Sequence, residues 1–291
     1  MRAIIYASVV ALIAFPTFSL ANISMPKNTI PIYSDKIISK RLADMPSPID
    51  IKWSKALKHD LNGYVIRGRK STENILGKAA IYFPIFEKYM IEYGLPLELK
   101  YLSVIESRLR PTVVSHVGAG GLWQLMPGTA KKYGLKINKY VDERFDPQKS
   151  TEAAMKHLSY LYQRFGNWKL AIAAYNCGSG RMDRAIRKAD SYEYDALKKH
   201  LPKETTDYVR RFTAASYALH YYLFHDLHPR YPDYNIQMTE SKRVYKRRSF
   251  RQIASETGIA AEIIKKLNPS YLQEIIPGSE KGNYLLLPVL G

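Results

Sequence analysis

Apolar side chains recur at helical spacing along most of this 291-residue chain, and this periodicity constrains the fold more than any other feature. From Ser71 they are separated by three or four residues, and so lie on one helix face: Ile75, Ala79, Tyr82, Phe86 and Met90. Gly94 and Pro96 end this segment, and Pro84 inside it predicts a kink or a break. The pattern predicts a long helix that buries one face.

The same spacing predicts further helices as far as about residue 226. They are expected from Leu95 to Glu106, Pro127 to Tyr133, Pro147 to Phe165, Trp168 to Tyr175, Ser179 to Ala189, and Leu201 to His225. Strand signals are scarce over this stretch. We therefore expect an all-α domain over residues 60–228 in a chain that is mainly α.

The N-terminus has the pattern of a secretory signal over residues 1–21. Arg2 precedes an apolar run from Ala3 to Phe15, and Ser19-Leu20-Ala21 is typical of a peptidase site. A retained membrane anchor is the alternative, but the run is short for a bilayer. We expect export to the periplasm or cell envelope, without a lipid anchor on an N-terminal Cys. Residues 22–59 are rich in Pro, Ser and Lys and predict an extended lead-in.

The formal net charge of +18 predicts attraction to polyanions. Export and the scatter of basic residues argue against nucleic acid, since only Arg243 to Arg251 form a dense run. Anionic wall or membrane surfaces are the expected partners, and a solvated basic face without a ligand is the alternative. The single cysteine, Cys177, excludes an intramolecular disulfide and is interpreted as a small buried hydrophobe or, less simply, a reactive thiol.

The composition changes after residue 228, and residues 229–241 are interpreted as a linker. Residues 242–291 predict a strand at 243–246, helices at 250–257 and 260–267, and a strand at 284–288. This β-α-α-β order resembles the LysM peptidoglycan-binding module, as do Ser249 to Ala254, Ile263 to Pro269 and Leu285 to Pro288. The module's usual Gly-Asp is replaced by Arg248-Ser249, and a long insertion follows Asn268. Sugar binding and a purely structural role both remain open.

Glu106 is the outstanding candidate for chemistry in the helical region. Leu99, Leu102 and Glu106 fall at i, i+3 and i+7, so the carboxylate continues an apolar stripe. A carboxyl in an apolar pocket has a raised pKa and can donate a proton near neutral pH. The alternative is a structural carboxylate paired with Arg108 or Arg110. The remaining acids of the region are expected on exposed turns or helix starts, and none is placed as a second catalytic group: Glu98, Asp142, Glu143 and Asp146.

Four motifs accompany Glu106-Ser107 in order along the chain. They are Ser115 with Gly118-Ala119-Gly120-Gly121-Leu122-Trp123-Gln124-Leu125-Met126-Pro127, then Ala173-Ala174-Tyr175-Asn176-Cys177-Gly178, then Leu201-Pro202-Lys203-Glu204-Thr205, and Tyr208-Val209. On these motifs, residues 95–215 resemble the catalytic domain of family 1 lytic transglycosylases, with the soluble-lytic-transglycosylase or goose-lysozyme-like fold. Within that family, the membrane-bound lytic murein transglycosylase D group also joins this domain to LysM repeats.

The resemblance implies a lysozyme-like all-α enzyme that cleaves peptidoglycan glycan strands between N-acetylmuramic acid and N-acetylglucosamine. Glu106 would act as acid and then as base, and the product would be a 1,6-anhydromuramic end, formed without a metal or cofactor. A lysozyme-type muramidase on the same fold, and a non-catalytic peptidoglycan-binding protein, are the competing hypotheses.

The resemblance also implies roles for six further residues. Ser115 and Gln124 would hydrogen-bond the sugar or its N-acetyl group, and Met126 would pack on a ring. Tyr175 would position Glu106 or the N-acetyl group. The remaining two are Asn176, which would hold the loop or bind sugar, and Tyr208, which would bring a phenol to the carboxylate. The two tyrosines as core residues, and Met126 as plain packing, are the structural alternatives.

Overall fold

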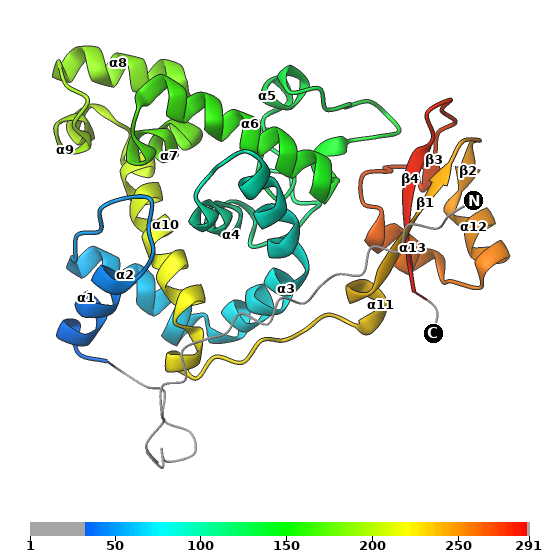
Figure 1. Cartoon of the computed structure of the whole chain (residues 1–291), viewed down its shortest axis with the longest axis horizontal. Coiled ribbons are helices and arrows are strands. Elements are labelled where there is room, and N and C mark those ends of the chain that lie inside the picture. Colours follow the sequence, from blue (N-terminus) through cyan, green and yellow to red (C-terminus); the bar gives the residue numbers. More distant parts are fainter. Residues whose placement is uncertain (1–32, 290–291) are drawn as a thin grey trace.

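Helices form most of residues 33–289, which are the residues that the computed structural model describes (Figure 1). The expected mainly α fold is confirmed. The predicted signal segment, residues 1–21, lies outside the described residues. None of the helices within residues 33–289 is both long and apolar enough to cross a membrane.

The helical domain follows the periodicity closely. Short 3-10 turns separate some of its helices. The helices are α3 (Arg69–Glu92), α4 (Tyr101–Ser107), α5 (Pro127–Lys132), α6 (Pro147–Phe165), α7 (Trp168–Cys177), α8 (Ser179–Ala189), α9 (Tyr194–Leu197) and α10 (Lys203–His220). Side-chain caps set two of the starts. Asp146 accepts hydrogen bonds from the first turn of α6, and Asn167 does so for α7, as expected of N-cap residues.

Pro84 does not divide α3, which is a single helix from Arg69 to Glu92. A proline removes the hydrogen bond that its N–H would give to the carbonyl four residues earlier. That carbonyl belongs to Ala80, and both Ala80 and Pro84 are exposed. Water can therefore satisfy the freed carbonyl, which removes the main reason for the helix to break.

The expected extended lead-in over residues 22–59 is wrong for its described part. It forms α1 (Asp35–Asp44) and α2 (Lys55–Asn62), which are capped by Ser34 and Ser54. Their apolar side chains form a second core cluster with Ala214 and Tyr217 of α10. The helices form because α10 buries their narrow apolar faces, a contribution that local composition does not reveal.

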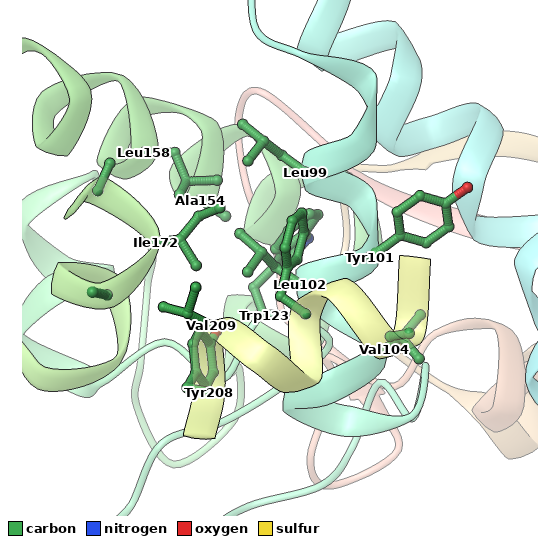
Figure 2. Packing of buried hydrophobic residues seen from close by; sticks show 14 of the residues in the cluster. Leu99, Tyr101, Leu102, Val104, Trp123, Ala154, Leu158, Ile172, Tyr208 and Val209 are labelled. Carbon is green, nitrogen blue, oxygen red and sulfur yellow. The ribbon is translucent and has the colours of Figure 1, made fainter. Parts of the chain in front are cut away.

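The main core lies between α3, α4, α6, α7 and α10 (Figure 1). In Figure 2, Val209 of α10 lies beside Ile172 of α7, and Leu102 and Trp123 lie on the same side of both. Trp123 is fully buried. Its ring lies 4.8 Å from that of Phe86, and its Nε1 donates to Thr151 Oγ1 at 3.0 Å. The segment after α4 is thus anchored in the core by its largest side chain.

The C-terminal module holds two antiparallel strand pairs and two helices. Its elements are β1 (Thr239–Val244), β2 (Arg248–Ser249), α12 (Phe250–Thr257), α13 (Ala261–Leu267), β3 (Ile275–Ile276) and β4 (Asn283–Pro288). β1 pairs with β4, and these are the two strands of the expected β-α-α-β order. The short strands β2 and β3, which pair with each other, were not expected. Ser249 and Gln252 form a capping box, which explains how α12 begins without the usual Gly-Asp.

The interpretation of residues 229–241 as a linker is also wrong in part. The stretch contains α11 (Tyr234–Gln237) and the start of β1. Arg230 N donates to the Glu73 carbonyl at 2.9 Å, and its guanidinium pairs with the Glu73 carboxylate at 2.9 Å. A Cβ on Gly77 would lie 1.7 Å from the Arg230 carbonyl oxygen, so only glycine lets the chain cross α3 there. The connection is docked on the helical domain.

The module touches the helical domain through main-chain pairing. Asp142 N donates to the Ser270 carbonyl and Leu272 N to the Tyr140 carbonyl, each at 2.9 Å. The paired segment of the module lies in the insertion after Asn268. Figure 1 shows the partner segment as the loop between α5 and α6 that reaches toward the strands.

Candidate active site

Glu106 is the next-to-last residue of the short helix α4. Leu99 and Leu102, which precede it on the same stripe, are fully buried, and Glu106 itself is largely enclosed but keeps some contact with solvent. Burial raises the pKa of its carboxyl from 4.5 to about 7. At neutral pH the protonated and ionised forms of a carboxyl with this pKa are both populated, so it can give a proton and can also take one.

Tyr208, on α10, is the hydrogen-bond partner of Glu106. Its hydroxyl donates to Glu106 Oε1 at 2.5 Å. This bond and the charge of Arg211 favour the carboxylate and lower the Glu106 pKa, but burial outweighs them. Burial and the nearby Glu106 raise the Tyr208 pKa well above 10, so the phenol keeps its proton and remains a donor.

Tyr175, on α7, completes a cluster with these two side chains. Its hydroxyl donates to the carbonyl oxygen of Trp123 at 2.7 Å. Burial, and next the charge of Glu106, raise the pKa of Tyr175 well above 10. The hydroxyl of Tyr175 is therefore fixed to the backbone of the Gly-rich segment, and its ring lies near enough to Glu106 for the carboxylate charge to act on the phenol.

Residues 113–126 form a tight loop that carries Ser115, Gln124 and Met126. Ser115 Oγ accepts from Ala119 N at 3.0 Å, and the Gln124 amide donates to the carbonyls of Val113 and Gly121 at 3.0 and 2.9 Å. Both side chains thus support the loop in this structure. Met126 is 44% exposed, so its thioether is open to a ligand and is not core packing.

The loop needs glycine at a point of close approach. Gly121 has φ +83°, and a Cβ there would lie 1.9 Å from the Arg144 carbonyl oxygen. Ser107, beside Glu106, donates to the carbonyls of Ser103 and Leu122 at 3.0 and 2.9 Å. The end of α4 is therefore fastened directly to this loop.

Asn176 makes no hydrogen bond with Glu106, Tyr175 or Tyr208 among the described residues. Its Oδ1 accepts from Thr205 Oγ1 at 2.8 Å, which ties the end of α7 to the first turn of α10. Cys177 next to it is buried, and burial raises its thiol pKa, as expected of a small buried hydrophobe. The structure therefore bonds Tyr208 to Glu106, places Tyr175 near the carboxyl, and places Asn176 in a neighbouring contact.

An ion pair of Glu106 with a nearby arginine is not found among the described residues. Arg110 Nε donates to the Ser107 carbonyl at 3.1 Å, and Arg108 is exposed. The structural alternative that the sequence left open is therefore not supported, because the carboxyl faces a phenol instead of a guanidinium.

The expectation that Asp142 and Glu143 are exposed is wrong. Both are buried, at 4% and 6% exposure. Asp142 forms a bidentate pair with Arg144, whose Nη2 lies 2.7 Å from Asp142 Oδ2. Arg144 Nη1 also donates to the carbonyls of Gly118 and Leu125, at 2.6 and 3.2 Å. Apolar periodicity does not predict this contact between Arg144 and the loop. The only sequence signal for it is the Asp-x-Arg spacing of Asp142 and Arg144.

Comparison with known proteins agrees with this geometry. Residues 84–198 match the family model "Transglycosylase SLT domain", and residues 239–289 match "Lytic transglycosylase MltD, LysM-like domain". The chain is 34% identical over 154 residues to membrane-bound lytic murein transglycosylase D of Escherichia coli strain K12. It is 32% identical over 152 residues to the soluble lytic murein transglycosylase of the same strain.

These alignments cover 52% and 49% of this chain, but only 34% and 23% of the two relatives, so the chain spans about a third or less of their length. The crystal structure of the 70 kDa soluble lytic transglycosylase from Escherichia coli aligns at 30% identity with a TM-score of 0.43, over 50% of this chain and 25% of that one. The resemblance stated from the motifs is confirmed at the level of domains. The chain carries a transglycosylase SLT domain followed by a LysM-like domain of the lytic transglycosylase MltD type.

Proposed function

We propose that this chain is an exported lytic transglycosylase that cleaves the β-1,4 bond between N-acetylmuramic acid and N-acetylglucosamine in peptidoglycan. The observation that carries the proposal is Glu106, held in an SLT domain with a pKa of about 7 and one phenol donor on Oε1. No acidic residue is hydrogen-bonded to it among residues 33–289. A single group of this kind can serve as acid and then as base.

In the first step, the protonated Glu106 gives its proton to the glycosidic oxygen, and the bond from that oxygen to C1 of the muramic residue breaks. The substrate's own N-acetyl carbonyl stabilises the positive charge at C1. Because Tyr208 donates to Oε1, the proton that moves is carried by Oε2.

In the second step, the Glu106 carboxylate takes a proton from the 6-hydroxyl of the same muramic residue. The 6-oxygen then bonds to C1, which gives a 1,6-anhydro end and consumes no water. Most glycosidases use a second carboxylate for a nucleophile or a water activator. The scheme needs none, in keeping with the phenols that surround Glu106.

The supporting residues have proposed roles consistent with their positions. Tyr175 and Tyr208 hold the carboxyl, Ser115 and Gln124 shape the loop and present their remaining polar atoms to the sugar, and Met126 packs against a ring. Asn176 keeps α7 in register with α10. The LysM-like module would keep the enzyme on its polymer.

Digestion of purified sacculi with mass analysis of the sugar ends tests the reaction. We expect anhydromuramic ends, and a loss of roughly a hundred- to ten-thousandfold in rate for Glu106→Gln, with Glu98→Gln as a matched control on the neighbouring 3-10 turn. Reducing muramic ends would instead identify a muramidase. If neither the parent protein nor Glu106→Gln changes sacculus morphology, and both still bind sacculi, the chain is a non-catalytic binder.

A further inference from the structure

A basic recess of about 190 Å³ lies at the end of α4 and is lined there by Arg108. Its wall comes from α2, from the π-helical turn Gly63–Arg67, and from α10. Two positions place it next to the reaction site. Arg108 follows Glu106 by two residues, and Arg211 lies one helical turn after Tyr208 and lowers the Glu106 pKa by its charge.

Two guanidinium groups in this recess are uncommitted. Neither Arg108 nor Arg211 makes an ion pair or side-chain hydrogen bond with any residue from 33 to 289, and both are exposed. The one lining acid, Asp60, is already paired with Arg210 at 2.7 Å. Arg67 donates to the His59 carbonyl at 2.9 Å. The recess therefore presents positive charge that the protein itself does not neutralise.

A neutral donor lies between these charges. Burial raises the pKa of Tyr64 to about 12, against a smaller opposing effect of Arg108 and Arg211, so its phenol stays protonated. Its hydroxyl has no hydrogen-bond partner in the described part of the chain. Arg108 also has φ +53°, a left-handed conformation that costs energy for any residue but glycine. Donors on three separate elements thus converge on one small space.

We propose that this recess binds a free carboxylate of the stem peptide on a muramic residue beside the cleaved bond. The inference rests on the proposed function, because the sugars of a glycan strand are neutral and its peptides carry the carboxylates. A space of about 190 Å³ admits a carboxylate together with the carbon atoms that carry it. Guanidinium groups bind carboxylates with two parallel hydrogen bonds, which suits Arg108 and Arg211.

A pair of small ligands that differ by one carboxylate tests the assignment. N-acetylmuramyl-L-alanine, which has a single free carboxylate, and its C-terminal amide are titrated against the full chain carrying Glu106→Gln, which cannot turn over. We expect the carboxylate form to bind roughly tenfold more tightly, as for hydrogen bonds to a charged group. Adding Arg211→Gln removes that preference. Arg187→Gln, which removes an exposed charge from α8 outside the recess, preserves it.

Equal binding of the two ligands by the parent protein would overturn the inference, as would equal weakening of both ligands by Arg211→Gln. Since binding is measured without turnover, these results do not depend on the reaction. A second measurement compares cleavage of peptide-bearing glycan strands whose stem carboxylates are free with strands whose stem carboxylates are amidated, where Arg108→Gln and Arg211→Gln should raise KM only for the strands with free carboxylates. A rate that amidation leaves unchanged but that still needs Glu106 would reject the recess and leave the proposed function standing.

Discussion

Removing the Arg144 guanidinium should destabilise the helical domain more than any exposed ion pair could. Arg144 and Asp142 are 6% and 4% exposed and share a bidentate contact. Arg144→Met leaves the Asp142 carboxylate buried without its partner, at a cost of about 3–5 kcal/mol. The carbonyls of Gly118 and Leu125 lose a donor as well, which adds about 1 kcal/mol each. These losses are large against a typical stability of about 5–15 kcal/mol.

Urea unfolding followed by tryptophan fluorescence measures this effect, since Trp123 and Trp168 lie in the helical domain and Trp53 packs against the core cluster that α1 and α2 share with α10. Arg164→Met is the matched control. Its partner Asp183 lies 2.9 Å away, but Arg164 is 43% exposed by side chain, so the cost should stay below about 1 kcal/mol. Asp142→Asn with Arg144→Met should cost less than the two single changes summed. A loss below about 1 kcal/mol for Arg144→Met would refute the reasoning.

Four further predictions follow from the same contacts. Glu106→Gln should stabilise the fold by about 3 kcal/mol more at pH 8 than at pH 5, as measured by thermal unfolding. The pKa of the Glu106 carboxyl rises from 4.5 to about 7 on folding, so the stability that its protonation gives is lost as pH rises through that window, whereas Gln does not titrate. An equal effect at both pH values would contradict this. Tyr208→Phe removes a bond that lowers the Glu106 pKa, so the alkaline fall in cleavage rate should move to higher pH, and a shift to lower pH would exclude this role. Leu272→Pro deletes the N–H given to the Tyr140 carbonyl, and hydrogen exchange should then rise in residues 137–142 but not in α7. The net charge of +18 should make cleavage of sacculi slower as salt rises, and a flat profile would remove electrostatic attraction from the account.

Periodicity was sufficient for the elements that bury a continuous apolar face. The helices α3, α6, α8 and α10 were expected within a few residues of their observed bounds, because each repeats apolar residues over several turns or has a side-chain cap. The raised pKa of Glu106 follows from the stripe of Leu99 and Leu102 that the carboxyl continues, whereas the Tyr208 phenol beside it was implied by the family resemblance alone. The sequence is sufficient where residues within a few positions of each other determine the local structure.

Long-range contacts account for what the sequence did not reveal. The helices α1 and α2 depend on apolar residues of α10 more than 150 positions away, such as Ala214. Asp142 and Glu143 have charged neighbours and a proline nearby, which are typical of an exposed turn. Asp142 is buried against Arg144 and the main chain of the module, and the buried Glu143 carboxylate accepts from Lys136 N and Lys149 Nζ. The role of Arg211 in the basic recess likewise depends on which helix α10 packs against.

The insertion that weakens the likeness to LysM is the part of the module that contacts the helical domain. Ser270 and Leu272 pair with residues 140–142, and Asp142 in that segment holds Arg144 against the Gly118 and Leu125 carbonyls. A chain of direct contacts therefore runs from the module to the loop, whose Leu122 carbonyl accepts from Ser107 beside Glu106. A carboxyl kept protonated by burial depends on walls that do not open to water. Removing the module should then lower the rate even on short soluble glycans, for which binding to the polymer gives no advantage.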